Sequence, residues 1–179
     1  MKINLTLRKF MNQTLWLYIW RFQPFHNGHK SIVDTMLKDN EKNLILIGVS
    51  WIKSPETDPY TYEKRLKFIL ETYQDIHNLD IAPLIDMDSD ERWVQQMLAI
   101  CYVQKASHIK LYCWDESEDS AVQVINKYIH LLNWKKLEII EIDRNKIPVS
   151  GTQVRHEIKE AWVDSIEKLV PEAVYKTLK

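Results

Sequence analysis

The sequence predicts an α/β fold in which a doubly wound, parallel, five-stranded sheet carries helices on both faces. Short apolar runs rich in β-branched and aromatic residues recur along the chain, which is typical of buried parallel strands. Segments with helical spacing of apolar residues lie between these runs. With 179 residues, 45% of them hydrophobic, the chain is the size of one domain that can bury a sizeable core.

The predicted elements alternate along the chain. The strand candidates are 15–20 (LWLYIW), 44–49 (LILIGV), 79–85 (LDIAPLI), 108–113 (HIKLYC) and 137–142 (LEIIEI). The helix candidates between them are 28–38, 61–74, 91–104 and 117–132. Right-handed crossovers between such strands make the sheet Rossmann-like, with ligands bound beyond the carboxyl ends of the strands. Residues 150–178 predict a short C-terminal helical tail of two helices.

Composition limits the classes of function. The 24 basic and 25 acidic residues give a net charge of −1, so no overall field recruits nucleic acid or an anionic membrane. Cys101 and Cys113 form no CxxC pair, which argues against a zinc site or a disulfide framework. Without a signal-peptide pattern or a membrane span, we expect a cytoplasmic protein. We expect a single domain over 1–179, with residues 1–12 as a disordered extension and Met11 as an alternative start.

The segment RFQPFHNGHK, residues 21–30, follows the first strand candidate and predicts an anion site. His26 and His29 fall where that strand gives way to a helix, whose N-terminus favours anions. Gly28 lets the backbone approach a ligand closely, and Arg21 adds a permanent fork of donors. The alternative is a pair of surface histidines near a turn.

Two motifs carry a resemblance to a known family. RFQPFHNGH resembles the signature of the HxGH nucleotidyltransferase superfamily and looks most like nicotinamide-mononucleotide adenylyltransferases of the archaeal type. VSGTQVR, residues 149–155, is similar to that family's (S/T)GTxxR element. The similarity runs from about residue 14 to the C-terminus. It implies a nucleotidyltransferase domain that joins ATP and nicotinamide mononucleotide by in-line attack on the α-phosphate, giving NAD and pyrophosphate. It also implies Mg²⁺ with ATP, and a homo-oligomer.

The resemblance also assigns site residues. The catalytic residues that it implies are Arg21, His26, His29 and Arg155. The substrate-binding residues are Phe22, Gln23, Pro24, Gly28, Arg65, Asp86, Trp93, Ser150, Gly151 and Thr152. No protein metal ligands are expected.

Three of these assignments have ordinary structural alternatives. Arg65, from DPYTYEKR, would contact ATP phosphates, or would otherwise be a solvated charge on a helix. Trp93, from IDMDSDERW, would stack on the pyridine ring, or would otherwise pack in the core. Ser150 and Thr152 can cap a helix start beside a phosphate, or simply cap an ordinary helix. The acidic run DESED, 115–119, predicts acid at a helix N-terminus rather than a metal site.

Tryptophan and glycine depart from the family pattern. Average usage of about 7% predicts roughly 12 glycines, but the chain has 3 glycines and 7 tryptophans. Six of these tryptophans stand where glycine is natural, either in the family motifs or in turns and helix ends: Trp16, Trp20, Trp51, Trp114, Trp134 and Trp162. We interpret them as glycines encoded by UGA in a genetic code that reads this triplet as glycine, which leaves only Trp93 genuine.

Other functions remain open from sequence. One is transfer by another HxGH nucleotidyltransferase, of the pantetheine-phosphate or glycerol-phosphate type. The second is a non-catalytic nucleotide-binding homologue, which genuine tryptophans in the nucleotide pocket would favour. The sequence leaves the preference for nicotinamide or nicotinate mononucleotide undecided.

Overall fold

The computed structural model describes residues 13–39, 41–50, 54–115, 119–132, 136–143, 147–160 and 163–179. The predicted extension and the tryptophans at 51, 134 and 162 lie outside this described part. Among the described residues, no helix is both long and apolar enough to span a bilayer.

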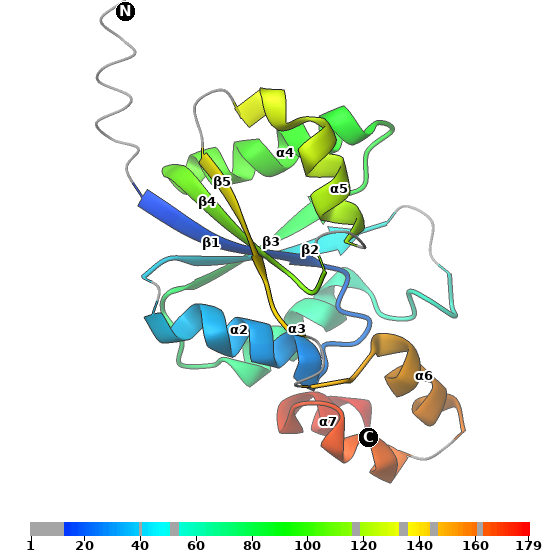
Figure 1. Cartoon of the computed structure of the whole chain (residues 1–179). Coiled ribbons are helices and arrows are strands. Elements are labelled where there is room, and N and C mark those ends of the chain that lie inside the picture. The colour runs from blue at the N-terminus through cyan, green and yellow to red at the C-terminus, as the bar shows by residue number, and fades with distance from the viewer. Residues whose placement is uncertain are drawn as a thin grey trace, which may run out of the picture.

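The centre of the molecule is a five-stranded parallel sheet (Figure 1). Its strands are β1 (Gln13–Trp20), β2 (Asn43–Val49), β3 (Leu79–Ile85), β4 (Ala106–Cys113) and β5 (Lys136–Glu141). The order across the sheet is β3-β2-β1-β4-β5, and every neighbouring pair is parallel. The order reverses between β1 and β4, which places the switch point of a doubly wound sheet at the carboxyl ends of these two strands. The predicted fold class is confirmed.

Helices cover both faces of the sheet (Figure 1). One face carries α4 (Asp90–Val103) and α5 (Ser120–Lys127), while the other carries α2 (Asn27–Asp39) and α3 (Tyr62–Thr72). The side chains of β1 alternate between the two layers, as a strand requires. Leu15 and Leu17 pack under α4 and α5, whereas the ring of Tyr18 packs in the opposite layer.

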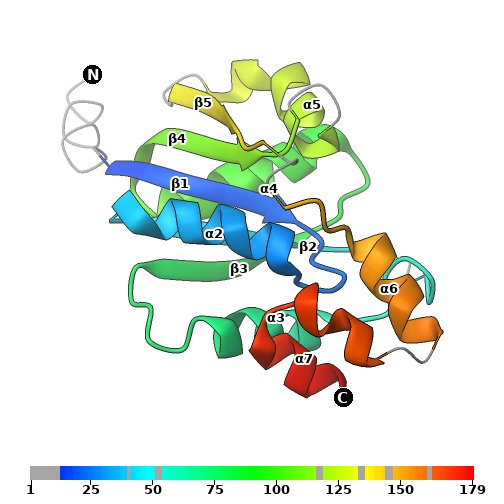
Figure 2. The ribbon, with the colours of Figure 1, turned by 60° about the horizontal axis from the view of Figure 1, so that its bottom comes forward.

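The C-terminal tail lies beside the end of the sheet at which β1 ends (Figure 2). It contains α6 (Gly151–Lys159), a 3₁₀ helix η3 (Val163–Lys168) and α7 (Glu172–Leu178), one segment more than the two helices predicted. α7 packs on α3, and η3 packs on α6. The tail is tied to the first motif, because the Asn27 N–H donates to the Leu169 carbonyl at 2.9 Å.

The helix predicted over 117–132 is shorter than its pattern suggested. α5 ends at Lys127, and a 3₁₀ turn η1 (Ile129–Leu132) follows. The Tyr128 N–H is shared between the carbonyls of Val124 and Ile125, which is the bonding of a helix that tightens as it ends. The helices α3, α4, α5 and α6 begin at side-chain caps, namely Thr61, Ser89, Asp119 and Ser150.

Candidate active site

Two adjacent cavities open beyond the carboxyl ends of β1 and β4. The first, of about 590 Å³, lies between the β1–α2 loop, the segment after β4 and the start of α6. The second, of about 460 Å³, lies between the end of β1, the β3–α4 segment and the start of α5. Three residues, Trp20, Arg21 and Asp119, line both cavities and therefore stand between them.

Most predicted site residues line these cavities. The first cavity brings together Arg21, Gln23, His26, His29, Ser150, Gly151, Thr152 and Arg155. The second is lined by Arg21, Asp86 and Trp93. The remaining predicted residues, Phe22, Pro24, Gly28 and Arg65, are not among the residues that line either cavity.

The two histidines of the first motif form a locked pair. Their rings stack with centroids 3.6 Å apart. The His26 N–H donates to Nδ1 of His29 at 3.3 Å, and the His29 N–H donates to Nδ1 of His26 at 3.4 Å. Because each Nδ1 accepts a hydrogen bond, the proton of each neutral imidazole lies on Nε2. The pair therefore presents Nε2–H donors.

His29 is the more deeply placed of the two. Its side chain is buried, and its Nε2 has no hydrogen-bond partner among the described residues. Burial lowers the pKa of His29 well below its usual 6.5, and the adjacent His26 lowers it further. A buried donor without a partner costs free energy, so a ligand oxygen at this point would satisfy it.

Gly28 is required by this stacking. A Cβ at position 28 would lie 2.9 Å from Cε1 of His26 and 3.2 Å from the carbonyl oxygen of Val149. The helix N-terminus is also less open than the sequence suggested. The N–H groups of Asn27 and His29 already donate to Leu169 and to the His26 ring. The histidine side chains therefore provide donors that the engaged amides cannot.

The second motif docks directly on the first. Nη1 of Arg155 donates to the carbonyl oxygen of Gln23 at 2.6 Å, across 132 residues of sequence. A Cβ at position 151 would lie 2.9 Å from the same oxygen, so only glycine fits this approach. Ser150 caps α6 by accepting from the Gln153 N–H at 3.1 Å, as predicted. Thr152 is not a second cap, because its hydroxyl accepts from Nη2 of Arg155 at 3.1 Å.

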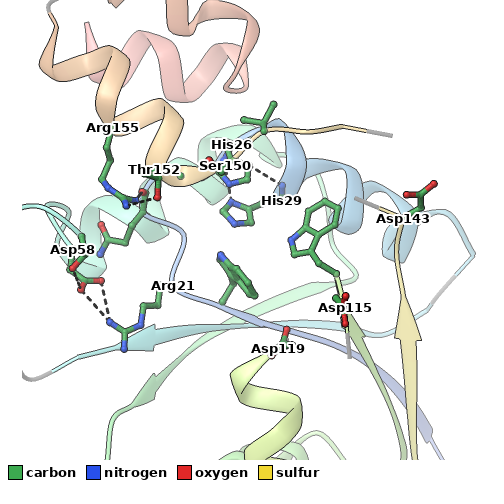
Figure 3. A pocket seen from close by; sticks show the side chains of 16 residues that line it. Arg21, His26, His29, Asp58, Asp115, Asp119, Asp143, Ser150, Thr152 and Arg155 are labelled. Atoms are coloured by element: carbon green, nitrogen blue, oxygen red, sulfur yellow. Dashed lines mark hydrogen bonds and ion pairs between the residues drawn. The ribbon is translucent and has the colours of Figure 1, made fainter. Parts of the chain in front are cut away.

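Arg21 is held between two carboxylates. Its Nη1 lies 3.2 Å from Oδ2 of Asp58, and its Nη2 lies 3.7 Å from Oδ2 of Asp86. Figure 3 shows Arg21, Asp58 and Arg155 on one side of the first cavity, opposite Asp115 and Asp143. Sequence reasoning missed Asp58, although it lies in the quoted segment DPYTYEKR. No local pattern links it to Arg21, which is 37 residues away.

Arg65 serves the backbone in this structure. Its side chain is buried, and its Nη1 donates to the carbonyl oxygens of Arg21 at 2.6 Å and Gly48 at 2.7 Å. The guanidinium thus joins the ends of β1 and β2 just below the site. The expected contact with ATP phosphates would require it to leave these carbonyls, so that contact stays a prediction.

The other residues of the first motif shape the loop from within. Phe22 is fully buried, and its ring meets His29 edge-on with centroids 5.0 Å apart. The Gln23 side chain exchanges two hydrogen bonds of 3.0 Å with the backbone of Tyr60. Pro24 is buried and follows a cis peptide bond. Phe22 and Pro24 support the loop, whereas Gln23 also faces the cavity.

Two of the tryptophans at proposed glycine positions line the first cavity. Trp20 lines both cavities, and its ring centroid lies 5.9 Å from that of His29. Trp114 lines the first cavity at the end of β4. Trp16 lies farther from the cavities in β1, where Nζ of Lys110 lies 5.7 Å from its ring centroid. The indoles of Trp20 and Trp114 thus occupy the end of the sheet where a ligand would approach the backbone.

Within the described residues, no cluster of three His, Cys, Asp or Glu side chains could hold a metal ion. Asp119, the last residue of the acidic run, caps α5, as the composition of the run predicts. Oδ1 of Asp119 accepts from the N–H groups of Ala121 at 2.9 Å and Val122 at 3.2 Å.

The fold and the paired motifs define a class of protein. The family described as cytidylyltransferase-like matches residues 17–157, and the chain belongs to this family. The resemblance drawn from the motifs is confirmed by curated relatives. A nicotinamide-nucleotide adenylyltransferase of Methanospirillum hungatei is 34% identical over 85 residues, covering 47% of this chain and 49% of the relative. A nicotinamide/nicotinic acid mononucleotide adenylyltransferase of Acinetobacter baylyi is 26% identical over 167 residues, covering 91% of this chain and 84% of the relative.

Solved structures share the fold. A bifunctional NMN adenylyltransferase/ADP ribose pyrophosphatase of Francisella tularensis, complexed with AMP and a manganese ion, superposes with a TM-score of 0.67 at 19% identity. That match covers 93% of this chain and 48% of the other. A NadR protein in complex with NAD and AMP-PNP gives a TM-score of 0.62 at 16% identity, covering 84% of this chain and 44% of the other. The chain thus spans about half the length of these solved chains and of the Methanospirillum relative.

Proposed function

We propose that the chain is a nicotinamide-nucleotide adenylyltransferase that joins ATP and nicotinamide mononucleotide to give NAD and pyrophosphate. The observation that carries this proposal is the docking of the SGTxxR segment on the HxGH loop. Arg155 and Gly151 meet the Gln23 carbonyl beside the stacked histidines. The names of the curated relatives point to the same reaction.

In this proposal ATP occupies the first cavity. Its triphosphate lies among Arg21, Arg155 and the histidines, and the Nε2–H of His29 meets an oxygen of the α-phosphate. The buried, unpartnered Nε2 supports this placement because it needs an acceptor. Neutral imidazoles suffice, since an Nε2–H donates without carrying charge.

The mononucleotide occupies the second cavity, with its pyridinium ring on the face of Trp93 and Asp86 close by. Its phosphate then points toward the wall shared with the first cavity. In-line attack by a phosphate oxygen on the α-phosphorus forms the new P–O bond and breaks the bond to the departing pyrophosphate. The nucleophile is already an anion, so no general base is needed, and the protein acts by positioning and charge neutralisation.

Mg²⁺ enters with ATP as part of the substrate. Mg²⁺ commonly keeps several waters and binds phosphate oxygens with one or two carboxylates, so it needs no dedicated protein cage. The manganese ion of the Francisella structure is consistent with a divalent cation at such a site.

A coupled assay for NAD formed from ATP and nicotinamide mononucleotide tests the proposal. NAD formation that depends on both substrates is the expected result. If pantetheine phosphate or glycerol phosphate accepts the nucleotidyl group instead, the chain is an HxGH nucleotidyltransferase with a different acceptor. The tryptophans lining the first cavity favour a second candidate, a non-catalytic nucleotide-binding protein, if the indoles are genuine. ATP binding without turnover, in the printed chain and in its glycine variants alike, would support this second candidate.

A further inference from the structure

A glutamine closes the edge of the sheet behind the second cavity. β3 is an edge strand, and Gln96, in α4, lies beside its last residue, Ile85. The Ile85 N–H donates to Oε1 of Gln96 at 2.8 Å, and Nε2 of Gln96 donates to the Ile85 carbonyl oxygen at 3.1 Å. The side-chain amide therefore satisfies both backbone groups of this residue, as a further strand would.

The backbone at this point is also held from the other side. The N–H of Asp86, the next residue, donates to the carbonyl oxygen of Val49 at the end of β2, at 2.8 Å. Ile85 and Asp86 are thus tied to α4 on one side and to β2 on the other. Asp86 lines the second cavity, and its Oδ2 lies 3.7 Å from Nη2 of Arg21. The two hydrogen bonds of Gln96 therefore fix the point from which this carboxylate enters the cavity.

The same hydrogen bonds fix the helix that carries Trp93. Trp93 and Gln96 stand at positions i and i+3 of α4, so they share one face of the helix. Trp93 lines the second cavity. A shift of α4 along β3 would break both hydrogen bonds of Gln96 and would move the indole relative to Asp86. A planar amide that pairs with both groups of one residue tolerates little displacement, because hydrogen bonds weaken steeply as they bend.

We propose that Gln96 is a positioning residue of the acceptor site, which holds Asp86 and Trp93 in the arrangement that binds the mononucleotide. This inference rests on the proposed function, because it takes the second cavity as the place of the acceptor. Gln96 is not among the residues that line either cavity, so it acts through these two neighbours rather than by contact with a substrate. A site that is held in its binding geometry has less freedom to lose when the ligand arrives, so it binds more tightly.

The substitution Gln96→Met tests the role of the two hydrogen bonds. Methionine has nearly the same length as glutamine and a similar helix propensity, so α4 keeps its packing and loses only the amide. The matched control is Gln95→Met, at the preceding residue of the same helix. The Gln95 side chain is exposed, donates to Oε1 of Glu91 at 3.3 Å, and is not among the residues that line either cavity.

Two measurements are needed. The first is hydrogen exchange of the Ile85 amide, which reports on the contact without any substrate, and which should be about ten-fold faster or more in Gln96→Met. The second is the dissociation constant of nicotinamide mononucleotide and, separately, of ATP, by calorimetry. We expect Gln96→Met to weaken mononucleotide binding by about ten-fold and to leave ATP affinity within about two-fold of the parent. Gln95→Met should change neither the exchange rate nor the two affinities.

Unchanged exchange at Ile85 would overturn the inference, and so would an equal loss of affinity for both substrates in Gln96→Met, which general damage to the fold produces. If the parent binds no mononucleotide, the same measurements in a Trp20→Gly background remove the indole from the shared wall. Absence of binding there too would contradict the proposed function, together with the inference that rests on it. A mononucleotide affinity that is measurable in the parent and the same in Gln96→Met would contradict the positioning role alone.

Discussion

At the scale of single residues, the candidate site contains a histidine, His29, whose pKa is held well below its usual value by burial. His29 is surrounded by the rings of Trp20, Phe22, Phe25 and His26. The centroids of these rings lie 3.6 to 5.9 Å from the centroid of the His29 imidazole. This packing removes water from the imidazole, which disfavours its charged form. The Nε2–H that remains is a neutral donor held in a fixed direction.

Replacing His29 with alanine should lower turnover by about 10² to 10³-fold and weaken ATP binding far less. A donor whose hydrogen bond strengthens as charge builds on the phosphate acts on rate rather than on ground-state affinity. Steady-state kinetics together with ATP binding on the same variant separate the two effects. The control is His77→Ala, at an exposed histidine between α3 and β3. A rate for the His29 variant within a few fold of the parent would remove His29 from the mechanism.

The same burial predicts how stability depends on pH. The pKa of His29 is depressed in the folded chain, while the unfolded chain keeps a value near 6.5. As the pH falls below about 6.5, the unfolded state takes up a proton that the folded state does not, so stability is lost. His29→Gln removes this contribution. The measurement is denaturant unfolding of both proteins from pH 7.5 to pH 5, in steps of about one pH unit. The free energy of unfolding of the parent should fall relative to that of His29→Gln as the pH is lowered. A constant difference between the two proteins would contradict the burial of the imidazole.

Trp20→Gly should raise the pKa of His29 toward its ordinary value. The indole is one of the rings that exclude water from the imidazole, and glycine leaves that side open. The titration of the His29 ring proton, followed by NMR, measures the change directly. Trp16→Gly is the matched control, because Trp16 lies farther down β1 and lines neither cavity. An unmoved pKa in the Trp20 variant would mean that the other aromatic rings alone desolvate His29.

At the scale of elements, the central strands β1, β2 and β4 were predictable because their burial makes them mainly apolar runs. β2 and β3 begin within one residue of the predicted starts. The alternation of strands with helices indicated that neighbouring strands run parallel, joined by helical crossovers. The first motif was visible because its residues are adjacent in sequence. The pairing of Arg21 with Asp58 and the burial of Asp119 were not visible, since both depend on segments that meet only in the folded chain.

The second motif shows the same limit. The sequence placed Ser150 at a helix start, and the cap is present. It could not show that Nη1 of Arg155 donates to the Gln23 carbonyl. Nor could it show that Nη1 of Arg65 donates to two carbonyls at the ends of β1 and β2. Both arginines were expected to bind phosphate. The structure gives each a backbone contact that local patterns do not encode.

Helix α6 depends on its cap. Ser150→Ala removes the acceptor for the Gln153 N–H and should cost about 1 kcal/mol of stability, a fall of about 2 to 4 °C in Tm. Because α6 positions Arg155, ATP affinity should fall as well. Ser150→Asn, which restores an acceptor, should recover most of the stability. Thermal unfolding of the two variants measures this, and an unchanged Tm in Ser150→Ala would show that packing alone holds the helix start.

At the scale of the whole molecule, the site is assembled at the one edge of the sheet where its order reverses. The HxGH loop follows β1, the Arg155 helix follows β5, and the two cavities share a wall at the end of β1. Transfer between substrates in separate cavities requires that the wall be open to the reacting phosphates. Arg21 and Asp119 can flank such an opening, but the indole of Trp20 adds bulk to the wall itself.

The coding sequence and a glycine variant together decide what stands in that wall. We expect UGA at codons 16, 20, 51, 114, 134 and 162 and UGG at codon 93. We also expect the chain with glycine at all six positions to bind ATP more tightly and to form NAD faster than the printed chain. Removal of Trp20 and Trp114 opens the first cavity, which should raise ATP affinity, although glycine at positions 16 and 20 costs roughly 0.5 to 1 kcal/mol of stability each in strand β1 relative to alanine.

Calorimetry with ATP and the coupled assay for NAD measure the gain, and Trp93→Gly serves as the opposite control. Trp93 is the one tryptophan that the recoding interpretation leaves genuine, and it lines the second cavity. Its removal should therefore weaken binding of the mononucleotide and leave ATP affinity nearly unchanged. UGG at the six codons, with ATP affinity and activity untouched by the glycine substitutions, would mean that the protein uses its tryptophans as printed. The indole of Trp20 would then be a native part of the shared wall, and the first cavity would not be the ATP site proposed for it.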